Sequence, residues 1–416
     1  MKTLKLPLDN ADMLDENEAL GVDSVDAVVL ADAIERDFGV VIETVSQGRR
    51  AFSSLSGLAA FLEEAGGALK EERPVDEAPA VADRRYTITP VCRANAHEVA
   101  VLFRAIYGEE FPVKYVYHGD QVMREIDEGR LAASLALDEK GAAAGYVSAF
   151  KPAPNRRLWE GGNLLVLPAH GEGDLAWMLF NHYLRPGSLP GGEADGVFGE
   201  AVCHHYYTQF NCAKAGFADC ALALDQLDSA SFREHRPDTE RVACLLQFFE
   251  HSVPPAPIYL PDCYATVLRK LCAPLRPRTF LSAKAPLPDS GETVHHDDFF
   301  EAAGTWRVSV ASLGGGWEPM LDELLREAAG RNVTSLQVVL STSLPCTGAA
   351  AESMRQRGFF LGGIFPRWFG SDGILMQKVL GKEPDYDGIK LYSSVARELL
   401  AFIREDREVV ARRGKG

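Results

Sequence analysis

Apolar residues recur at helical spacing in the first part of the chain. In residues 24–39 they fall every three or four positions, as on one face of an amphipathic helix, and a glycine ends the pattern. Residues 53–67 repeat this design, with Ser53 or Ser54 as the expected N-cap and two glycines as the stop. We therefore predict an all-helical domain over residues 1–66.

The pattern changes twice after this domain. Residues 67–85 are charged, rich in proline and alanine, and aperiodic, which is typical of a tether. From residue 86 onward, short apolar runs with strand character alternate with stretches of helical periodicity. The expected strands and helices are 86–91, 94–107, 131–138, 143–150, 163–167, 174–184, 196–202, 207–217, 218–224, 241–249, 305–313, 318–330, 335–341, 348–359, 373–380 and 393–413.

This alternating region consists of two blocks that end alike. Each closes with a strand, a helix, the tetrapeptide KAGF or QRGF, and a final strand, which indicates a duplicated α/β fold. We expect domains at residues 86–230 and 231–384, followed by a C-terminal helix over residues 385–416. The predicted fold class is multidomain: an all-α helical bundle followed by an α/β (α+β) tandem of two similar halves.

The composition of the chain limits the kinds of binding partner and the cellular location that we expect. The net charge of −16 argues against nucleic acid, and residues 1–66 hold 13 acidic residues against 5 basic ones. No apolar run is long enough to cross a bilayer and no signal pattern opens the chain, so we expect a cytoplasmic protein without a membrane partner. The eight cysteines form no C-x-x-C pair, which favours reduced, packed thiols.

No metal site is expected. Cys203, His204 and His205 are alternative zinc ligands, as is the HHDD run at residues 295–298, but neighbouring histidine side chains diverge. A solvated loop is the preferred interpretation of both segments.

Ser24 stands in the run GVDSV, directly before the first apolar helix. Gly21, Asp23, Ser24 and Val25, with the helix that follows, resemble an acyl carrier protein over about residues 6–66. The resemblance implies that Ser24 carries 4′-phosphopantetheine, attached by a phosphopantetheinyl transferase and charged by an acyl-loading enzyme. A helix N-terminus suits the phosphodiester because its unpaired N–H groups favour an anion. The alternative is that Ser24 is a simple N-cap.

The carrier resemblance departs from its family in one respect. Carrier domains have a whole helix before this motif, and only 23 residues precede Ser24. We expect either that the true start lies upstream or that another part of the protein completes the bundle.

The junction VLPAHGEGDLAW lies between an expected strand and an expected helix. With the later FNCAKAGF, it resembles the GNAT acyltransferase superfamily over residues 86–228. The resemblance implies that the pantetheine and pyrophosphate of acetyl-CoA or another acyl-CoA bind at this junction. The residues concerned are Val166, Pro168, His170, Gly171 and Gly173. Taken alone, the junction could equally be a generic glycine-rich turn.

Residues 240–380 resemble a second GNAT-like half. Its loop SLGGGWEPML lacks the proline and the basic residue of the family's cofactor loop. We predict that this degenerate half is mainly structural and forms the other wall of a cleft.

Acyl transfer to an amine needs a base for the ammonium and an acid for the leaving thiolate. The segment FGEAVCHHYYTQFNC offers Glu200 as the base, acting through water, with His205 as a substitute. Tyr207 or Cys212 is the expected acid. The alternative for Glu200 is a structural carboxylate whose hydrogen bonds are satisfied.

These features together predict an acyltransferase of the GNAT type. It would move an acyl group from its own carrier domain, or from acyl-CoA, to an amine or another small-molecule acceptor. Two alternatives stay open: a non-catalytic platform that docks the carrier arm, and a loading module that charges its own carrier from acyl-CoA.

Overall fold

The computed structural model describes most of the chain beyond residue 44. The described residues are 34, 38, 40, 42, 45–66, 86–109, 111, 113–171, 174–185, 187–191, 194–205, 207–229, 240–252 and 257–413. Two compact units can be distinguished. The first holds Met1–Met123, Ser134–Val147 and Leu164–Leu179, and the second holds Arg124–Ala133, Ser148–Asn163 and Phe180–Gly416. None of the described helices is both long enough and apolar enough to cross a membrane.

Two helices of the first unit lie in the predicted all-helical domain: α2 (Val45–Ala51) and α3 (Leu55–Glu64). The Ser54 hydroxyl accepts a hydrogen bond from the Gly57 N–H at 3.0 Å, so Ser54 is the N-cap of α3, and the predicted helix is confirmed. A small apolar cluster contains Ala51, Phe52 and Phe61 from these helices and their connection. It also contains Ile34 and Val40, which precede them in the chain. Ser24 lies outside the described residues, so the carrier-like bundle stays a prediction.

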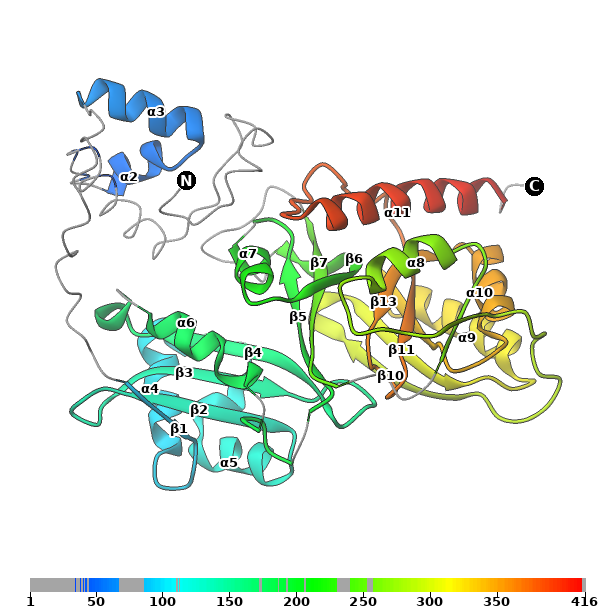
Figure 1. Cartoon of the computed structure of the whole chain (residues 1–416), viewed down its shortest axis with the longest axis horizontal. Coiled ribbons are helices and arrows are strands. Elements are labelled where there is room, and N and C mark those ends of the chain that lie inside the picture. The colour runs from blue at the N-terminus through cyan, green and yellow to red at the C-terminus, as the bar shows by residue number, and fades with distance from the viewer. Residues whose placement is uncertain are drawn as a thin grey trace. The chain divides into compact units, whose positions relative to one another are not determined.

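The rest of the first unit is a small sheet with helices (Figure 1). Its strands follow the order β1-β2-β3-β4, and β1 pairs antiparallel with β2 from Thr87 opposite Leu137. Strands β2, β3 and β4 also contribute residues to the second unit. The elements here are β1 (Thr87–Pro90), α4 (Ala96–Tyr107), η2 (Lys114–Tyr117), α5 (Gly119–Asp127), β2 (Leu131–Leu137), β3 (Ala143–Phe150), β4 (Leu158–Val166), η3 (Pro168–His170) and α6 (Leu175–Phe180).

The second unit is built on one long sheet with the strand order β4-β5-β7-β6-β13-β14-β12-β11-β10. Helices α8 and α11 cover β6 and β13 (Figure 1). The elements are η4 (His182–Leu184), β5 (Gly196–Val202), α7 (Tyr207–Lys214), β6 (Ala218–Asp228), β7 (Arg241–Glu250), β8 (Ile258–Leu260), α8 (Ala265–Cys272), β9 (Phe280–Ser282), β10 (Val294–Phe300), η6 (Glu301–Ala303), β11 (Thr305–Ser312), α9 (Trp317–Gly330), β12 (Ser335–Ser341), α10 (Thr347–Gln356), β13 (Phe360–Phe365), β14 (Gly373–Val379) and α11 (Ser394–Arg413).

The strand order contains the same arrangement twice. Strands β4-β5-β7-β6 and strands β11-β12-β14-β13 each begin with a parallel pair and continue with two antiparallel pairs. We call these two sets the first and the second repeat. They meet where β6 pairs with β13 at Ala221 and Gly363. The duplication predicted from the two sequence blocks is therefore present in the sheet.

The shared tetrapeptides KAGF and QRGF have the same structural role in both repeats. Gly216 and Gly358 follow α7 and α10 with φ values of 89° and 87°, a conformation that suits glycine. The N–H of the next phenylalanine then donates to a carbonyl five residues back, at 3.0 Å in the first repeat and 3.1 Å in the second. This is a Schellman-type helix end, and it turns each chain into its next strand.

Strand β7 extends the first repeat beyond the boundary expected at residue 230. It pairs with both β5 and β6, and each of those strands lies before that residue. The domain ranges given above stay a prediction. The expected HHDD loop at residues 295–298 is wrong, because these residues form the exposed strand β10, which pairs with β11.

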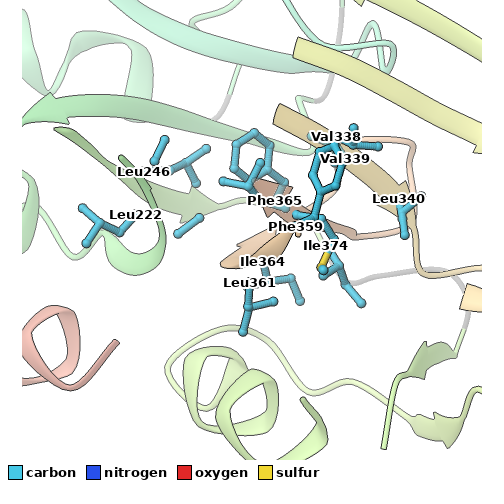
Figure 2. Close-up of a cluster of buried hydrophobic side chains, with 14 of the residues drawn as sticks. Leu222, Leu246, Val338, Val339, Leu340, Phe359, Leu361, Ile364, Phe365 and Ile374 are labelled. Atoms are coloured by element: carbon cyan, nitrogen blue, oxygen red, sulfur yellow. The ribbon is translucent and has the colours of Figure 1, made fainter. Parts of the chain in front are cut away.

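One apolar core runs through both repeats. Leu222 and Leu246 of the first repeat belong to the same buried cluster as Val338 and Phe365 of the second (Figure 2). These side chains are 3% exposed or less, so close packing contributes to holding the repeats together. The core explains why strands so far apart in sequence form one sheet.

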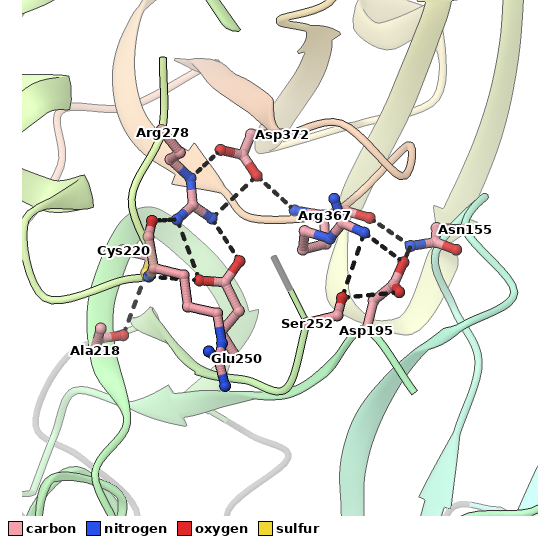
Figure 3. Close-up of polar contacts among 10 residues, drawn as sticks. Asn155, Asp195, Ala218, Cys220, Glu250, Ser252, Arg278, Arg367 and Asp372 are labelled. Atoms are coloured by element: carbon pink, nitrogen blue, oxygen red, sulfur yellow. Dashed lines mark hydrogen bonds and ion pairs between the residues drawn. The ribbon is translucent and has the colours of Figure 1, made fainter. Parts of the chain in front are cut away.

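Buried ion pairs reinforce this junction (Figure 3). Arg278 Nη2 lies 2.8 Å from Glu250 Oε1 at the end of β7, and its Nε lies 2.5 Å from Asp372 Oδ2 before β14. Arg367 of the second repeat pairs with Asp195, which precedes β5, at 3.0 Å. Arg278, from the segment between α8 and β9, thus contacts a carboxylate of each repeat, and the Arg367–Asp195 pair joins the two repeats directly.

Candidate active site

The parallel strands β4 and β5 separate after a short contact. They pair only at Leu158 with Gly196, Trp159 with Val197, and Glu160 with Phe198. Beyond these pairs β5 stays bonded to β7 as far as its end, so only its edge toward β4 is released. We call this opening, between residues 161–163 of β4 and 199–202 of β5, the strand gap.

Glycines line the start of the strand gap. A Cβ placed on Gly199 would meet no atom within 4 Å, and one on Gly161 would come no closer than 3.6 Å to the Phe198 carbonyl oxygen. Gly161 and Gly199 therefore leave open space at the start of the strand gap that a larger residue's side chain would occupy. Released N–H and C=O groups on the two edges can bind an extended ligand that carries amides, as a sheet edge binds an added strand.

Glu160 and Glu200 flank this gap on one face of the sheet. Glu160 is registered with Phe198, and Glu200 follows two residues later on β5, so the alternation of a strand places all three on the same side. Glu200 is engaged through both oxygens. Its Oε1 lies 2.6 Å from Arg307 Nη2, and its Oε2 accepts a hydrogen bond from Gln226 Nε2 at 2.5 Å.

These contacts close into a ring of side chains. Arg307 Nε donates to Gln337 Oε1 at 2.8 Å, and Gln337 Nε2 donates to Gln226 Oε1 at 3.3 Å. The carboxylate and the guanidinium are largely buried, with side-chain exposures of 13% and 5%. The geometry thus resembles the structural alternative for Glu200, and its role as a base stays a prediction.

Glu160 is the carboxyl group that sequence reasoning missed. Burial raises its pKa well above the usual value, the neighbouring Glu200 raises it further, and Arg307 lowers it. Unlike Glu200, it accepts no hydrogen bond from the described residues. A carboxyl with a raised pKa is a candidate for proton transfer at a functional site.

A buried hydroxyl packs on β4 two residues along the strand from this carboxyl. Ser148 on β3 is 1% exposed, and its Oγ has no hydrogen-bond partner among the described residues. It packs over Gly162, where a Cβ would approach the hydroxyl to 2.8 Å. Gly162 lies two residues after Glu160 on the same strand face, so the face offers both a proton acceptor and a hydroxyl.

The predicted acyl-CoA junction lies between β4 and α6, as expected, and contains a short turn. Pro168–His170 forms the 3-10 turn η3, after Val166 ends β4. The His170 N–H donates to Leu167 and the Gly171 N–H donates to Pro168, at 2.8 and 3.2 Å. These two N–H groups are therefore used inside the turn. Gly173 lies outside the described residues.

The His170 side chain contacts its own surroundings in the first unit. Its Nδ1 lies 3.0 Å from the Tyr86 hydroxyl. A surface depression of about 380 Å³ is lined by Asp138, Glu139, Lys140, Ala169 and His170. A basic role for His170 toward a phosphate stays a prediction.

The other predicted residues lie after β5. His205 stacks edge-on against His204 with ring centroids 4.5 Å apart, and its carbonyl accepts from Gln209 Nε2 at 3.1 Å. Tyr207 begins α7, and its side chain lies outside the described part. Cys212 is buried in α7, where burial and then Asp219 raise its thiol pKa to about 12. At that pKa the thiol holds its proton, as an acid must, but releases it reluctantly.

Two zinc alternatives were open for the histidines. Across the described residues, no group of three or more His, Cys, Asp or Glu side chains could hold a metal ion.

The second repeat keeps its parallel pair closed. Strands β11 and β12 are registered at six positions, from Thr305 with Ser335 to Val310 with Leu340. A strand gap is therefore described in the first repeat alone.

Neither a family model nor a curated protein matches the sequence. Some solved structures are similar to part of the chain. Several of them are N-acetyltransferases. Spermidine/spermine N-acetyltransferase SpeG from Vibrio cholerae is 13% identical, with a TM-score of 0.32, and the match covers 40% of this chain and 92% of that one.

Two further structures give similar values. NAA60 of Arabidopsis thaliana is 13% identical with a TM-score of 0.30, covering 40% of this chain and 98% of its own. An N-acetyltransferase from Staphylococcus aureus Mu50 is 9% identical with a TM-score of 0.31 and the same coverages. Likeness at these values carries no argument, so the proposal below rests on the chain's own residues.

Proposed function

We propose that this protein is an acyltransferase that moves an acyl group from a pantetheine thioester to an amine. The observation that carries the proposal is the strand gap, with Glu160 at its closed end. A pantetheine arm carries two amides, which suit the released backbone groups on the two strand edges. Its thioester would then lie near the carboxyl that can exchange a proton.

The chain's residues supply the proton handling. An amine reaches neutral solution mostly as an ammonium ion, and it must lose a proton before its nitrogen attacks the thioester carbon. Glu160, once ionised, accepts that proton, directly or through water. The C–N bond forms as the C–S bond breaks, and the departing sulfur takes up the second proton that the nitrogen loses and leaves as a thiol. Ser148 offers a hydroxyl that can orient the acceptor on the same face.

The donor is part of the same proposal. The GVDSV motif supports Ser24 as the attachment site of a phosphopantetheine arm, so the donor thioester can come from the protein's own N-terminal segment. A tether of fewer than twenty residues would give that donor a high effective concentration. Free acetyl-CoA is the alternative donor, and the experiment below includes both.

The test is a transfer assay on the full chain. Acetyl-CoA is offered with spermidine, glucosamine or a lysine-containing peptide in turn, and release of the CoA thiol and the acetylated amine are followed. A second arm first treats the protein with a phosphopantetheinyl transferase and CoA and weighs it, with Ser24→Ala as the control. We expect amine-dependent thiol release that slows at least about a hundredfold in Glu160→Gln.

Glu301→Gln, at an exposed carboxylate of η6, is the matched control and should keep the parent rate. Equal rates for Glu160→Gln and the parent would remove Glu160 from the mechanism. Binding of either donor without turnover on any amine would favour the non-catalytic docking platform. An acetyl group that is found by mass on the Ser24 arm and is not passed to any amine would favour the loading module.

A further inference from the structure

We propose that the second repeat contributes a residue to the acid–base site of the first. Arg307, on β11, is a positioning residue that holds the Glu200 carboxylate and places a positive charge beside Glu160. The proposal rests on the proposed function in so far as that proton exchange serves acyl transfer. It assigns the degenerate half a part in the chemistry in addition to its structural one.

The position of Arg307 is fixed from several sides. Its Nη2 contacts Glu200 at 2.6 Å and its Nε donates to Gln337 at 2.8 Å. Its Cζ also lies over two aromatic rings, 5.2 Å from the centre of Phe365 and 5.6 Å from that of Trp368. A planar guanidinium held by hydrogen bonds and stacking has little freedom to turn elsewhere.

The ring of contacts spans both repeats. Glu200 and Gln226 belong to β5 and β6 of the first repeat, whereas Arg307 and Gln337 belong to β11 and β12 of the second. No residue of the ring can be removed without leaving a buried polar group unpaired. The position of the Glu200 carboxylate next to Glu160 therefore depends on a strand that lies 107 residues away in sequence.

Two charged side chains of the described residues influence Glu160. Glu200 faces it from β5 and Arg307 from β11, and the amides of Gln226 and Gln337 are neutral. The nearby Cys244 on β7 is also neutral, because burial raises the pKa of its thiol well above the usual value. The single positive charge of Arg307 therefore favours the ionised form of Glu160 against burial and the neighbouring Glu200.

The experiment measures the Glu160 carboxyl directly, without any substrate. The full chain is labelled with carbon-13 glutamate, and the protonated carboxyl band is followed by isotope-edited infrared spectroscopy across pH. The band lost in Glu160→Gln identifies the residue. In Arg307→Met we expect the titration midpoint of Glu160 to rise by about one pH unit or more, because the cation is gone.

Two further variants test whether the positive charge of Arg307 sets the titration midpoint of Glu160. Arg307→Lys keeps the positive charge, so its midpoint should lie closer to the parent than to Arg307→Met. Arg331→Met removes a half-exposed arginine of the same repeat, which pairs with Glu327, and should leave the midpoint unchanged. Equal midpoints in Arg307→Met and the parent would overturn the proposal. So would a shift in Arg307→Lys as large as that in Arg307→Met.

Arg307→Met could fail to fold, since it leaves Glu200 buried without its cation. The same comparison is then made on Glu200→Gln and the double variant Glu200→Gln/Arg307→Met, in which residue 200 carries no charge. The double variant should titrate at the higher pH, and equal midpoints would again refute the role of Arg307. Because no acyl donor is present, these outcomes are independent of the transfer assay.

Discussion

The two repeats share one strand order and differ at their parallel pair. In the first repeat β4 and β5 are registered at three positions and then separate, whereas in the second β11 and β12 stay registered at six. The two repeats can be aligned on their first registered pairs, Leu158–Gly196 and Thr305–Ser335. In this alignment Gly161 is equivalent to Val308, and Gly199 is equivalent to Val338. The same topology therefore gives an open edge or a closed one, according to whether glycine or a β-branched residue follows the contact.

The same alignment relates the charged residues of the two repeats. Glu160 of β4 corresponds to Arg307 of β11, and Glu200 of β5 corresponds to Val339 of β12. Equivalent positions thus carry opposite charges, and the sheet brings them into one buried cluster. A repeat that lost its own opening can in this way retain a role through the side chain that it presents to the other.

The largest expected effect concerns the junction between the repeats. Arg278→Met would leave Glu250 and Asp372 buried without their cation, since all three side chains are 3% exposed or less. We expect the free energy of unfolding to fall by about 3–5 kcal/mol. Urea unfolding followed by fluorescence and by circular dichroism measures this loss.

Arg326→Met is the control for this change. Arg326 forms an exposed pair with Glu323 on α9 and should cost at most about 0.5 kcal/mol. A loss in Arg278→Met no larger than in Arg326→Met would show that the repeats do not depend on the buried charges. Two separate unfolding transitions in the parent would show that they fold independently.

The next effect tests the strand gap itself. Gly199→Val gives the first repeat the residue that the second has at Val338, and no atom lies within 4 Å of the new Cβ. The fold should therefore persist while the gap is filled. We expect the Kd for acetyl-CoA to rise at least about tenfold, a loss of about 1.4 kcal/mol, by isothermal titration calorimetry.

Gly330→Ala serves as its control, because this glycine near the end of α9 is also free of close contacts. Unchanged affinity in Gly199→Val would place acyl-CoA elsewhere. The parent should bind one acetyl-CoA per chain, and a second equivalent would mean that the closed pair of the second repeat also opens.

The sequence predicted local structure more successfully than the site. The α3 cap and the repeated KAGF and QRGF ends could be predicted because each depends on residues within one helical turn of one another. Segment 174–184 was expected to be one helix, yet α6 ends at Phe180 and the short turn η4 (His182–Leu184) follows. Helix ends depend on tertiary packing as much as on periodicity.

Glu160 and Arg307 were missed although each leaves a signal in the sequence. Both are single charged residues inside strands that are otherwise apolar, in LWEGGN and TWRVSV. A buried charge needs a partner, so such residues can be marked from sequence as candidates for a polar cluster. Which partner each finds depends on the order of strands in a sheet that joins both repeats, and no local pattern encodes that order.

The last expected effect is a pH dependence of stability that comes from Glu160. Its pKa is raised in the folded state, chiefly by burial, whereas an unfolded glutamate titrates near pH 4.3. Between these two values the folded chain holds more protons than the unfolded one, so the free energy of unfolding falls as pH rises. The contribution is complete below about pH 4 and is lost as pH passes the folded pKa. Its size is about 1.4 kcal/mol for each pH unit that separates the folded pKa from the unfolded one.

Glu160→Gln isolates this contribution, because its unfolding free energy can be subtracted from that of the parent at each pH. Glu301→Gln controls for the substitution itself. We expect the difference to decrease with rising pH and then level off, since both states of Glu160 are ionised above the folded pKa. A difference that stayed flat or increased would mean that Glu160 is not a buried carboxyl with a raised pKa. The two repeats would then still differ in the opening of their parallel strand pair, but the first repeat would have no carboxyl suited to proton transfer.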